Sequence, residues 1–286
     1  MKETEKLPPV NIRSLRVFDI EVSRHCNLVC EFCPREAFKN QGFMTPDTFA
    51  NFLKNTPMRT GDLVVFCGLG ESLLNPSFAH CLSALKNQYP LVKTQLITNG
   101  TLLTAKTVTM LLDSGINFII VSFNGTEAAT YERLMKGANF TQSMANIENA
   151  LAEIQKRKDT TAQLMVTYIL SNENFKEEEA IKAFWQAKGI RTIPQYMHNR
   201  GGFANSDSMS PITGSEPPER PCIYFQVYTF IAWNGDVLLC CNDIQHLHLL
   251  GNINNDSMTL IESRKEHYIT QNNWPDLCNT CTAPPK

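Results

Sequence analysis

Short runs rich in β-branched and aromatic residues alternate with helical stretches between about residues 15 and 200. This alternation is typical of parallel strands joined by crossover helices, and it predicts an α/β fold. Six strands are predicted, at Val17–Val22, Leu63–Cys67, Lys93–Thr98, Phe118–Ser122, Gln163–Leu170 and Thr192–Met197. Helices are expected between them, one from Thr45–Pro46 to about Lys54 and another from Thr104 to Ser114.

Polar or glycine-rich residues follow each of the first four predicted strands. They are the loop at Cys26, then Gly68–Glu71, Asn99–Gly100 and Asn124–Gly125. In an α/β barrel the carboxyl ends of the strands form the functional face. We therefore expect the site at this rim.

Charge and the N-terminal sequence limit the possible partners. The chain has 286 residues with 26 Lys+Arg against 28 Asp+Glu, so no global positive field attracts nucleic acid or anionic lipid. Residues 1–6 are charged, and neither a signal peptide nor a membrane-spanning stretch follows. We expect a cytoplasmic protein with no nucleic-acid or membrane partner.

Three of the ten cysteines lie close together directly after the first strand. Disulfides are not expected in a reducing compartment, so metal is the next hypothesis. Cys26, Cys30 and Cys33 have the spacing C-x3-C-x2-C, which places three soft ligands on one loop and suits an iron–sulfur cluster with one open iron. A zinc knuckle is the alternative, although structural zinc usually takes four ligands. Cys67 and Cys81 are expected to be small core residues.

This loop resembles that of the radical S-adenosylmethionine (radical SAM) enzymes, and the segment from Gly68 to Pro76 is similar to their glycine-glycine-glutamate strand end. The resemblance implies a partial (β/α)6 barrel, a [4Fe-4S] cluster that binds SAM, and reductive cleavage of SAM to a 5'-deoxyadenosyl radical. It also implies a reductant of the flavodoxin or ferredoxin type. Eight residues are implied to bind the cofactor: Phe32, Gly68, Gly70, Glu71, Thr98, Asn99, Ser122 and Lys136.

The resemblance implies different roles in SAM binding for these eight residues. The backbone at Phe32 would meet adenine, the Gly68–Glu71 segment would bind the methionine ammonium, and Thr98, Asn99 and Ser122 would lie near ribose and methionine. Lys136 would face the SAM carboxylate, where arginine is more usual.

Four further cysteines, Cys222, Cys240, Cys278 and Cys281, lie near the C-terminus. Strands at Tyr228–Trp233 and Val237–Cys241 around Asn234–Gly235 are predicted to form a hairpin beside them. Alone, this set is compatible with structural zinc. Beside a radical SAM domain it resembles the twitch domain, a shortened SPASM domain, which implies a second [4Fe-4S] cluster. Cys240 is preferred to Cys241 because strand neighbours point to opposite faces and because the family spacing coincides with it.

The predicted organisation has four parts: an extension at residues 1–15, a radical SAM partial barrel at 16–200, a linker or loop at 201–221 and a small auxiliary-cluster domain at 222–286. His246 and His248 are interpreted as loop histidines without a metal.

A complete set of four cysteines favours electron acceptance by the second cluster over substrate ligation. We therefore predict a dehydrogenase-type oxidoreductase that oxidises a secondary alcohol of a small polar metabolite. A similar arrangement in the twitch-bearing radical SAM dehydrogenases of aminoglycoside biosynthesis, which oxidise 2-deoxy-scyllo-inosamine, implies that Arg200 is a catalytic contact to SAM or substrate.

Two alternatives remain open. One is modification of a ribosomal peptide by crosslinking or epimerisation, for which the roughly 15 residues before the first strand are too few to form a leader-recognition domain. The other is a non-catalytic iron–sulfur or zinc regulator.

Overall fold

The computed structural model describes residues 15–38, 40–171, 174–202, 217 and 219–282. The strands are β1 (Val17–Ile20), β2 (Val29–Cys30), β3 (Leu63–Phe66), β4 (Lys93–Thr98), β5 (Phe118–Ser122), β6 (Met135–Lys136), β7 (Gln163–Leu170), β8 (Arg191–Tyr196), β9 (Tyr228–Ile231), β10 (Asp236–Leu238) and β11 (Leu249–Asn252). The α-helices are α1 (Pro46–Asn55), α2 (Phe78–Gln88), α3 (Ala105–Asp113), α4 (Ala128–Leu134), α5 (Phe140–Lys156), α6 (Glu178–Ala187), α7 (Ile223–Val227), α8 (Met258–Gln271) and α9 (Asp276–Asn279). Short 3-10 turns lie at η2 (Pro34–Ala37), η3 (Ser72–Leu74), η4 (Phe175–Glu177) and η5 (Arg200–Gly202).

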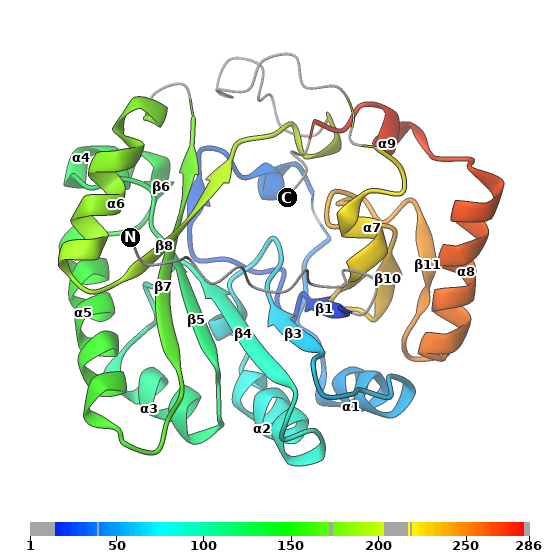
Figure 1. The fold of residues 1–286 in the computed structure, drawn as a ribbon, viewed down its shortest axis with the longest axis horizontal. Helices are drawn as coiled ribbons and strands as arrows, with labels where there is room; N and C mark the ends of the chain where they lie inside the picture. Colours follow the sequence, from blue (N-terminus) through cyan, green and yellow to red (C-terminus); the bar gives the residue numbers. More distant parts are fainter. Residues whose placement is uncertain (1–14, 39, 172–173, 203–216, 218, 283–286) are drawn as a thin grey trace, which may run out of the picture.

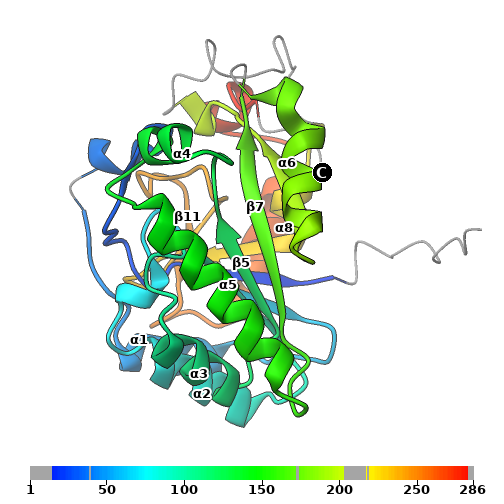
Figure 2. The same cartoon turned by 90° about the vertical axis from the view of Figure 1, so that its left-hand side faces the viewer.

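A single curved sheet organises the molecule. Its strand order is β11-β10-β9-β1-β3-β4-β5-β7-β8, and every pair from β9 to β8 is parallel. Figure 1 shows the sheet bent into an open barrel, and Figure 2 shows α2, α3 and α5 along its outer side. Since β11 and β8 are the two edges of the sheet in the described residues, the barrel is partial, as predicted.

The six strands predicted for the barrel are confirmed. They correspond to β1, β3, β4, β5, β7 and β8, and the bounds of β4, β5 and β7 are those predicted. Both predicted helices are also confirmed, since the Thr45 and Thr104 hydroxyls accept the N–H groups of Thr48 and Thr107 at 3.1 and 3.2 Å. These N-caps satisfy amide donors that otherwise have no partner in the first helical turn.

Alternating residues of β1 serve two different cores. Phe18 and Ile20 are buried in the large apolar core on the helical side of the sheet. Val17 packs instead with Val65 and with Val227 of α7 on the opposite face. The period of two residues along a strand therefore separates the outer core from the inner side of the barrel.

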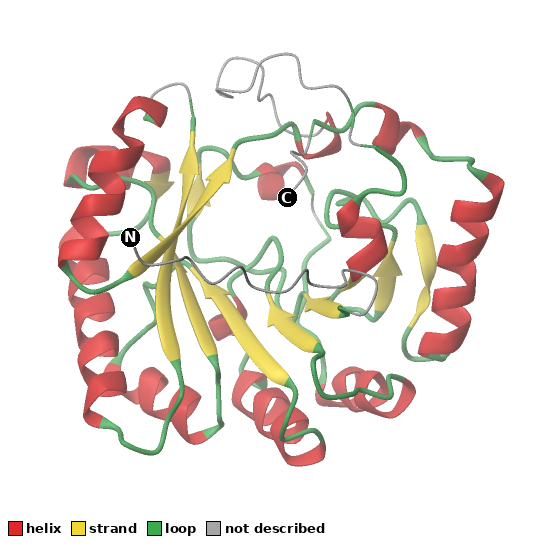
Figure 3. Cartoon of the chain, in the orientation of Figure 1, coloured by secondary structure: helices red, strands yellow, loops and turns green. Residues whose placement is uncertain are grey.

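The C-terminal segment continues the same sheet. β9 pairs with β1 in parallel, with Val17 opposite Tyr228 and Ile20 opposite Ile231. The predicted hairpin is confirmed, because β10 returns antiparallel to β9 after a turn at Gly235, where φ is +89°. Figure 3 shows these strands beside α7 and α8. Most of the predicted linker at 201–221, like the extension at 1–15, lies outside the described residues.

None of the helices in the described part of the chain combines the length and the apolar character needed to span a lipid bilayer.

Asn75, which follows the glycine-rich segment after β3, offers a test of how this rim is held together. Its amide donates to the carbonyl oxygens of Val22 and Met44 at 2.7 and 3.0 Å, and the side chain is buried. Asn75→Ala leaves both carbonyls without this donor and should lower the free energy of unfolding by about 3 kcal/mol in urea denaturation. Asn87→Ala, at an exposed position of α2, is the control and should change it little. Equal unfolding curves for the two variants would contradict this interpretation.

Candidate functional site

The loop that carries Cys26, Cys30 and Cys33 follows β1 and is fixed from two sides. The Cys33 N–H donates to the Cys30 carbonyl at 3.0 Å, which closes a tight turn between two of the thiols. β2 pairs antiparallel with β6, so that Cys30 lies opposite Met135. The three thiols are all half-buried and are close enough to influence one another electrostatically.

The segment after β3 lies directly against this loop. The Glu71 N–H donates to the His25 carbonyl at 2.8 Å. A Cβ atom on Gly70 would lie 2.2 Å from the Ser23 carbonyl oxygen, and one on Gly68 would lie 2.4 Å from Cγ of Glu21. Both glycines are therefore required by close approach, here to the chain's own β1 end.

The Glu71 carboxylate joins the ends of β3 and β4. It accepts hydrogen bonds from the Thr98 hydroxyl at 2.9 Å, the Asn99 N–H at 2.8 Å and the Leu73 N–H at 3.1 Å. Burial raises the pKa of Glu71, and these three donors oppose that shift. Glu71 therefore organises this rim by holding the ends of the two strands together.

Asn99 contacts the cysteine loop itself. Its side-chain nitrogen lies 3.8 Å from Sγ of Cys26 and donates to Asn27 Oδ1 at 2.9 Å, while its Oδ1 accepts the Thr101 N–H. A nitrogen donor aimed at a ligand sulfur is one of the features that tune iron–sulfur sites.

The remaining predicted cofactor residues border the same loop. Phe32 is half-buried between Cys30 and Cys33 along the chain. Ser122 is half-buried at the end of β5, and Lys136 is exposed in β6 opposite Val29. All eight predicted residues thus lie at the carboxyl ends of β3, β4 and β5 or around the cysteine loop.

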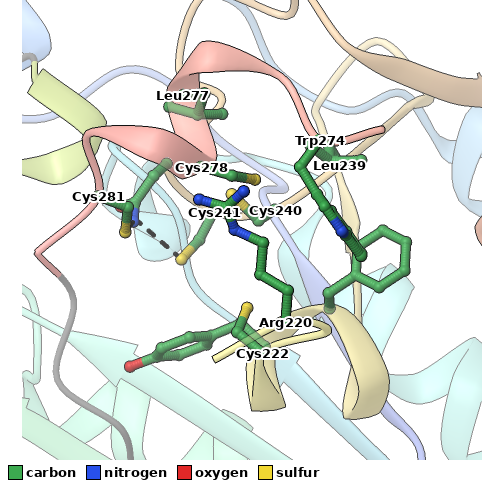
Figure 4. A pocket seen from close by; sticks show the side chains of 12 residues that line it. Arg220, Cys222, Leu239, Cys240, Cys241, Trp274, Leu277, Cys278 and Cys281 are labelled. Atoms are coloured by element: carbon green, nitrogen blue, oxygen red, sulfur yellow. Dashed lines mark hydrogen bonds between the residues drawn. The ribbon is translucent and has the colours of Figure 1, made fainter. Parts of the chain in front are cut away.

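The C-terminal cysteines line a common pocket (Figure 4). Cys222 immediately precedes α7, Cys240 follows β10, Cys278 lies in α9 and Cys281 lies just after it. The complete lining consists of Arg220, Cys222, Tyr224, Phe225, Leu239, Cys240, Cys241, Asn242, Trp274, Leu277, Cys278 and Cys281. Three chain segments therefore converge on one space rich in thiols.

The strand argument used to choose Cys240 over Cys241 was wrong. β10 ends at Leu238, so both cysteines lie in the turn beyond it and both line the pocket. Cys240 is influenced by Cys241, Cys278 and Cys281, and Cys241 also influences Tyr224 and Cys67. The choice of Cys240 stays a prediction that rests on the family spacing.

Burial controls the protonation of these thiols. It raises the pKa of Cys30 to about 12 and that of Cys278 to about 11, and it raises the pKa of Cys240 as well. The Arg220 guanidinium, which Figure 4 shows reaching toward the pocket cysteines, opposes the shift at Cys278. Thiolate ligands in such surroundings need a bound cation to hold them deprotonated.

Both cysteine sets fit an iron–sulfur group by the chemistry of their donors. Each contains soft thiol ligands and one buried asparagine close to a sulfur, Asn99 at Cys26 and Asn242 at Cys281, the latter at 3.7 Å. Within the described ranges, no three Cys, His, Asp or Glu side chains converge closely enough for a single metal ion.

Arg200 lies between the barrel and the C-terminal pocket. It begins η5, with φ of +50°, and its charge acts on Cys67 and Tyr224. The sequence analysis missed Arg220 and Asn242, although both stand within two residues of a predicted ligand cysteine. Their position beside these cysteines is the sequence feature that could have identified them as pocket residues.

Two family models match the chain. Residues 20–183 match the Radical SAM superfamily, and residues 222–282 match an iron-sulfur cluster-binding domain of the SPASM type. Together the matches imply an iron–sulfur cluster and SAM.

Known proteins with similar sequences and structures carry several different names. The chain is 28% identical over 209 residues to a probable GTP 3',8-cyclase of Methanocaldococcus jannaschii, covering 70% of this chain and 65% of that protein. It spans between about half and two thirds of the length of the first archaeal cyclases that it matches.

Two solved structures share the fold. BtrN in complex with AdoMet and 2-DOIA is 18% identical, with 93% of this chain and 92% of that one covered and a TM-score of 0.63. Streptococcus suis SuiB bound to the precursor peptide SuiA is 14% identical, with 94% and 71% covered and a TM-score of 0.70.

The bridging role of Glu71 can be tested by Glu71→Gln. The substitution replaces one acceptor oxygen by a donor that faces backbone N–H groups, and it should destabilise the fold by about 2 kcal/mol. It should also reduce the iron retained by the N-terminal cysteines, measured as iron per chain after anaerobic reconstitution. Glu127→Gln, at an exposed position, is the control. Full iron retention with parent stability in Glu71→Gln would show that the bridge is dispensable.

Proposed function

The chain belongs to the radical SAM superfamily and carries a SPASM-type iron–sulfur domain, and from this premise we propose that it oxidises a secondary alcohol of a small polar metabolite. Two [4Fe-4S] clusters are part of the proposal. Cys26, Cys30 and Cys33 would hold the first, and Cys222, Cys240, Cys278 and Cys281 would hold the second. When bound, these groups would supply a 5'-deoxyadenosyl radical from SAM and an acceptor for the electron that the substrate loses.

The observation that carries the proposal is the convergence of four C-terminal cysteines on one pocket. With four thiolates available, no iron of a second cluster needs a ligand from the substrate. Electron acceptance is then favoured over substrate binding at this site, which supports an oxidation.

The proposed oxidation would balance as a loss of two electrons and two protons. The C–H hydrogen of the carbinol would leave as an atom and end in 5'-deoxyadenosine. The O–H proton would pass to solvent and the remaining electron to the group held by the four C-terminal cysteines, which would leave a ketone.

The residues of the chain would bind and orient the reactants. The Gly68–Glu71 segment would bind the methionine end of SAM, with Phe32, Thr98, Asn99, Ser122 and Lys136 around it. Glu71 would hold this rim in place through its three hydrogen bonds. Arg200, whose charge acts on Cys67 and Tyr224, would contact the substrate or SAM.

The apolar wall of the second pocket supports water exclusion. Phe225 packs edge-on against Trp274 with ring centroids 5.0 Å apart, and Leu277 lines the same space. Low solvent access around a cluster is one of the factors that set its reduction potential. We propose a flavodoxin- or ferredoxin-type reductant and a cytoplasmic location, since thiol ligands require a reducing compartment.

Peptide modification is the second candidate, because SuiB, which was solved with its precursor peptide, shares the fold. A product analysis separates the candidates. A small polyol or amino sugar that becomes two hydrogens lighter supports our proposal, whereas turnover only of a peptide supports the alternative. A protein that never cleaves SAM would be a regulator.

Iron content and a single-ligand variant test the two-cluster assignment. Reconstituted protein should hold about eight iron and eight sulfide ions, four of each per cluster. Cys30→Ala should retain about half of them and form no 5'-deoxyadenosine, because the N-terminal set loses a ligand. Cys81→Ala removes a buried thiol of α2 outside both sets and serves as the control. Four iron with one zinc in the parent protein would make the second site structural.

The redox role of the second site is tested by Cys278→Ala. In the parent enzyme 5'-deoxyadenosine and oxidised product should form in equal amounts, because SAM is consumed once per turnover. In Cys278→Ala the ratio of product to 5'-deoxyadenosine should fall several-fold, since hydrogen abstraction needs only the first site. Cys240→Ala should behave in the same way, and Cys241→Ala should keep the parent ratio. If Cys278→Ala retained the parent ratio, the electron would leave by another route.

A further inference from the structure

A buried arginine joins the two cysteine sites. Arg24 stands two residues before Cys26, and its side chain is only 2% exposed. One nitrogen of its guanidinium donates to the Ile244 carbonyl at 2.5 Å, and another lies 2.5 Å from Nε2 of His246. Both partners belong to the loop that follows Cys240, so two nitrogens of the Arg24 guanidinium hold that loop.

The arginine determines the tautomer of His246. A guanidinium has donors only, so Nε2 must accept and the ring proton of neutral His246 must be on Nδ1. Nδ1 lies 3.1 Å from Oδ2 of Asp236, which can accept this proton in a hydrogen bond. Asp236 is in turn held by the side-chain amides of Asn234 and Asn252 at 2.6 and 3.0 Å. The imidazole is therefore oriented from both sides.

His246 is connected to Cys240 through Asp243. The Asp243 N–H donates to the Cys240 carbonyl at 3.1 Å, and the His246 N–H donates to the Asp243 carbonyl at 3.0 Å. The buried Asp243 carboxylate accepts the N–H groups of Leu247 and His248 at 3.0 and 2.8 Å. His246 has a φ of +58°, a conformation that non-glycine residues adopt only when their surroundings impose it.

On the other side Arg24 is anchored in the barrel. The backbone N–H of Arg24 donates to the Gly42 carbonyl at 2.9 Å, and the guanidinium of Arg24 lies 4.0 Å from the Glu21 carboxylate. Glu21 accepts the Leu69 N–H at 2.9 Å, which ties the arginine to the glycine-rich segment after β3. Rigid contacts thus extend from the Cys26 loop to the Cys240 loop.

We infer that Arg24 and His246 form a clamp that sets the separation and orientation of the two cysteine sites. In this role both are positioning residues, because they act through the loops that carry the ligands. The inference rests on the proposed function, in which the substrate electron must reach the second site, and it gives a role to His246, whose side chain is 9% exposed and lies against Arg24.

The test uses the reconstituted holoenzyme with His246→Leu, which removes both ring nitrogens. The primary readout is the magnetic interaction between the two reduced clusters in the electron paramagnetic resonance spectrum, without substrate. We expect a clearly altered interaction in His246→Leu, with full iron content and SAM cleavage at the parent rate. With substrate present, the ratio of product to 5'-deoxyadenosine should fall several-fold.

Two companion variants separate positioning from general damage. His248→Leu changes a histidine of the same loop outside the clamp and should match the parent in both readouts. His246→Gln keeps an oxygen that can accept from Arg24 and should restore most of the parent magnetic interaction. If His246→Leu loses the iron of the second site, Arg24→Lys decides by the same two readouts, because a lysine cannot contact Ile244 and His246 together as the guanidinium does.

The clamp and the proposed function can fail independently. An unchanged magnetic interaction in His246→Leu, or in iron-loaded Arg24→Lys where that variant replaces it, overturns the clamp. If the parent enzyme forms no oxidised product while the interaction still changes in His246→Leu, the proposed oxidation fails and the clamp stands.

Discussion

The parallel pairing of β9 with β1 joins the two ends of the chain into one sheet. About two hundred residues separate the two strands in sequence, yet Val17 lies opposite Tyr228. Because paired parallel strands end at the same rim, the loop after β1 and the turn after β9 emerge side by side. The loop after β1 carries Cys26, whereas β10 runs back antiparallel to β9 before the chain reaches Cys240. Ile244 and His246, shortly after Cys240, then contact Arg24 in the loop after β1. If β9 paired elsewhere, these two segments would not meet.

At this rim the chain buries polar groups, and it satisfies them by hydrogen bonds that also fix loops. Glu71 is the clearest case, since its carboxylate accepts from three donors while burial raises its pKa. Asn75 is also buried, and its side-chain amide donates hydrogen bonds to two carbonyl oxygens of neighbouring segments. A buried polar group without a partner costs more than a hydrogen bond returns, so these contacts define a single loop geometry. These contacts also hold the loop that carries Cys26, because the Glu71 N–H donates to the His25 carbonyl.

Several parts of this arrangement follow from local patterns in the sequence. The alternation of strands and helices, the threonine caps of α1 and α3, and the position of the Cys26 loop were all predictable, because each depends on residues within one or two elements. Cys240 and Cys241 show where local reasoning fails. The predicted strand would have separated them by face, but β10 ends at Leu238 and both thiols line the same pocket.

The sequence by itself determined the family, the partial barrel and the two sets of cysteines, because these depend on spacing along the chain and on periodicity. The tertiary structure alone decided that Gly70 is needed for an approach to Ser23, that Asn99 and Asn242 lie near the sulfurs of Cys26 and Cys281, and that Arg24 meets His246. Arg24 and His246 are 222 positions apart, and no local pattern connects them. The physical reason is that such contacts form only when distant segments are brought together by the sheet, after which burial selects the partners that satisfy each other's hydrogen bonds.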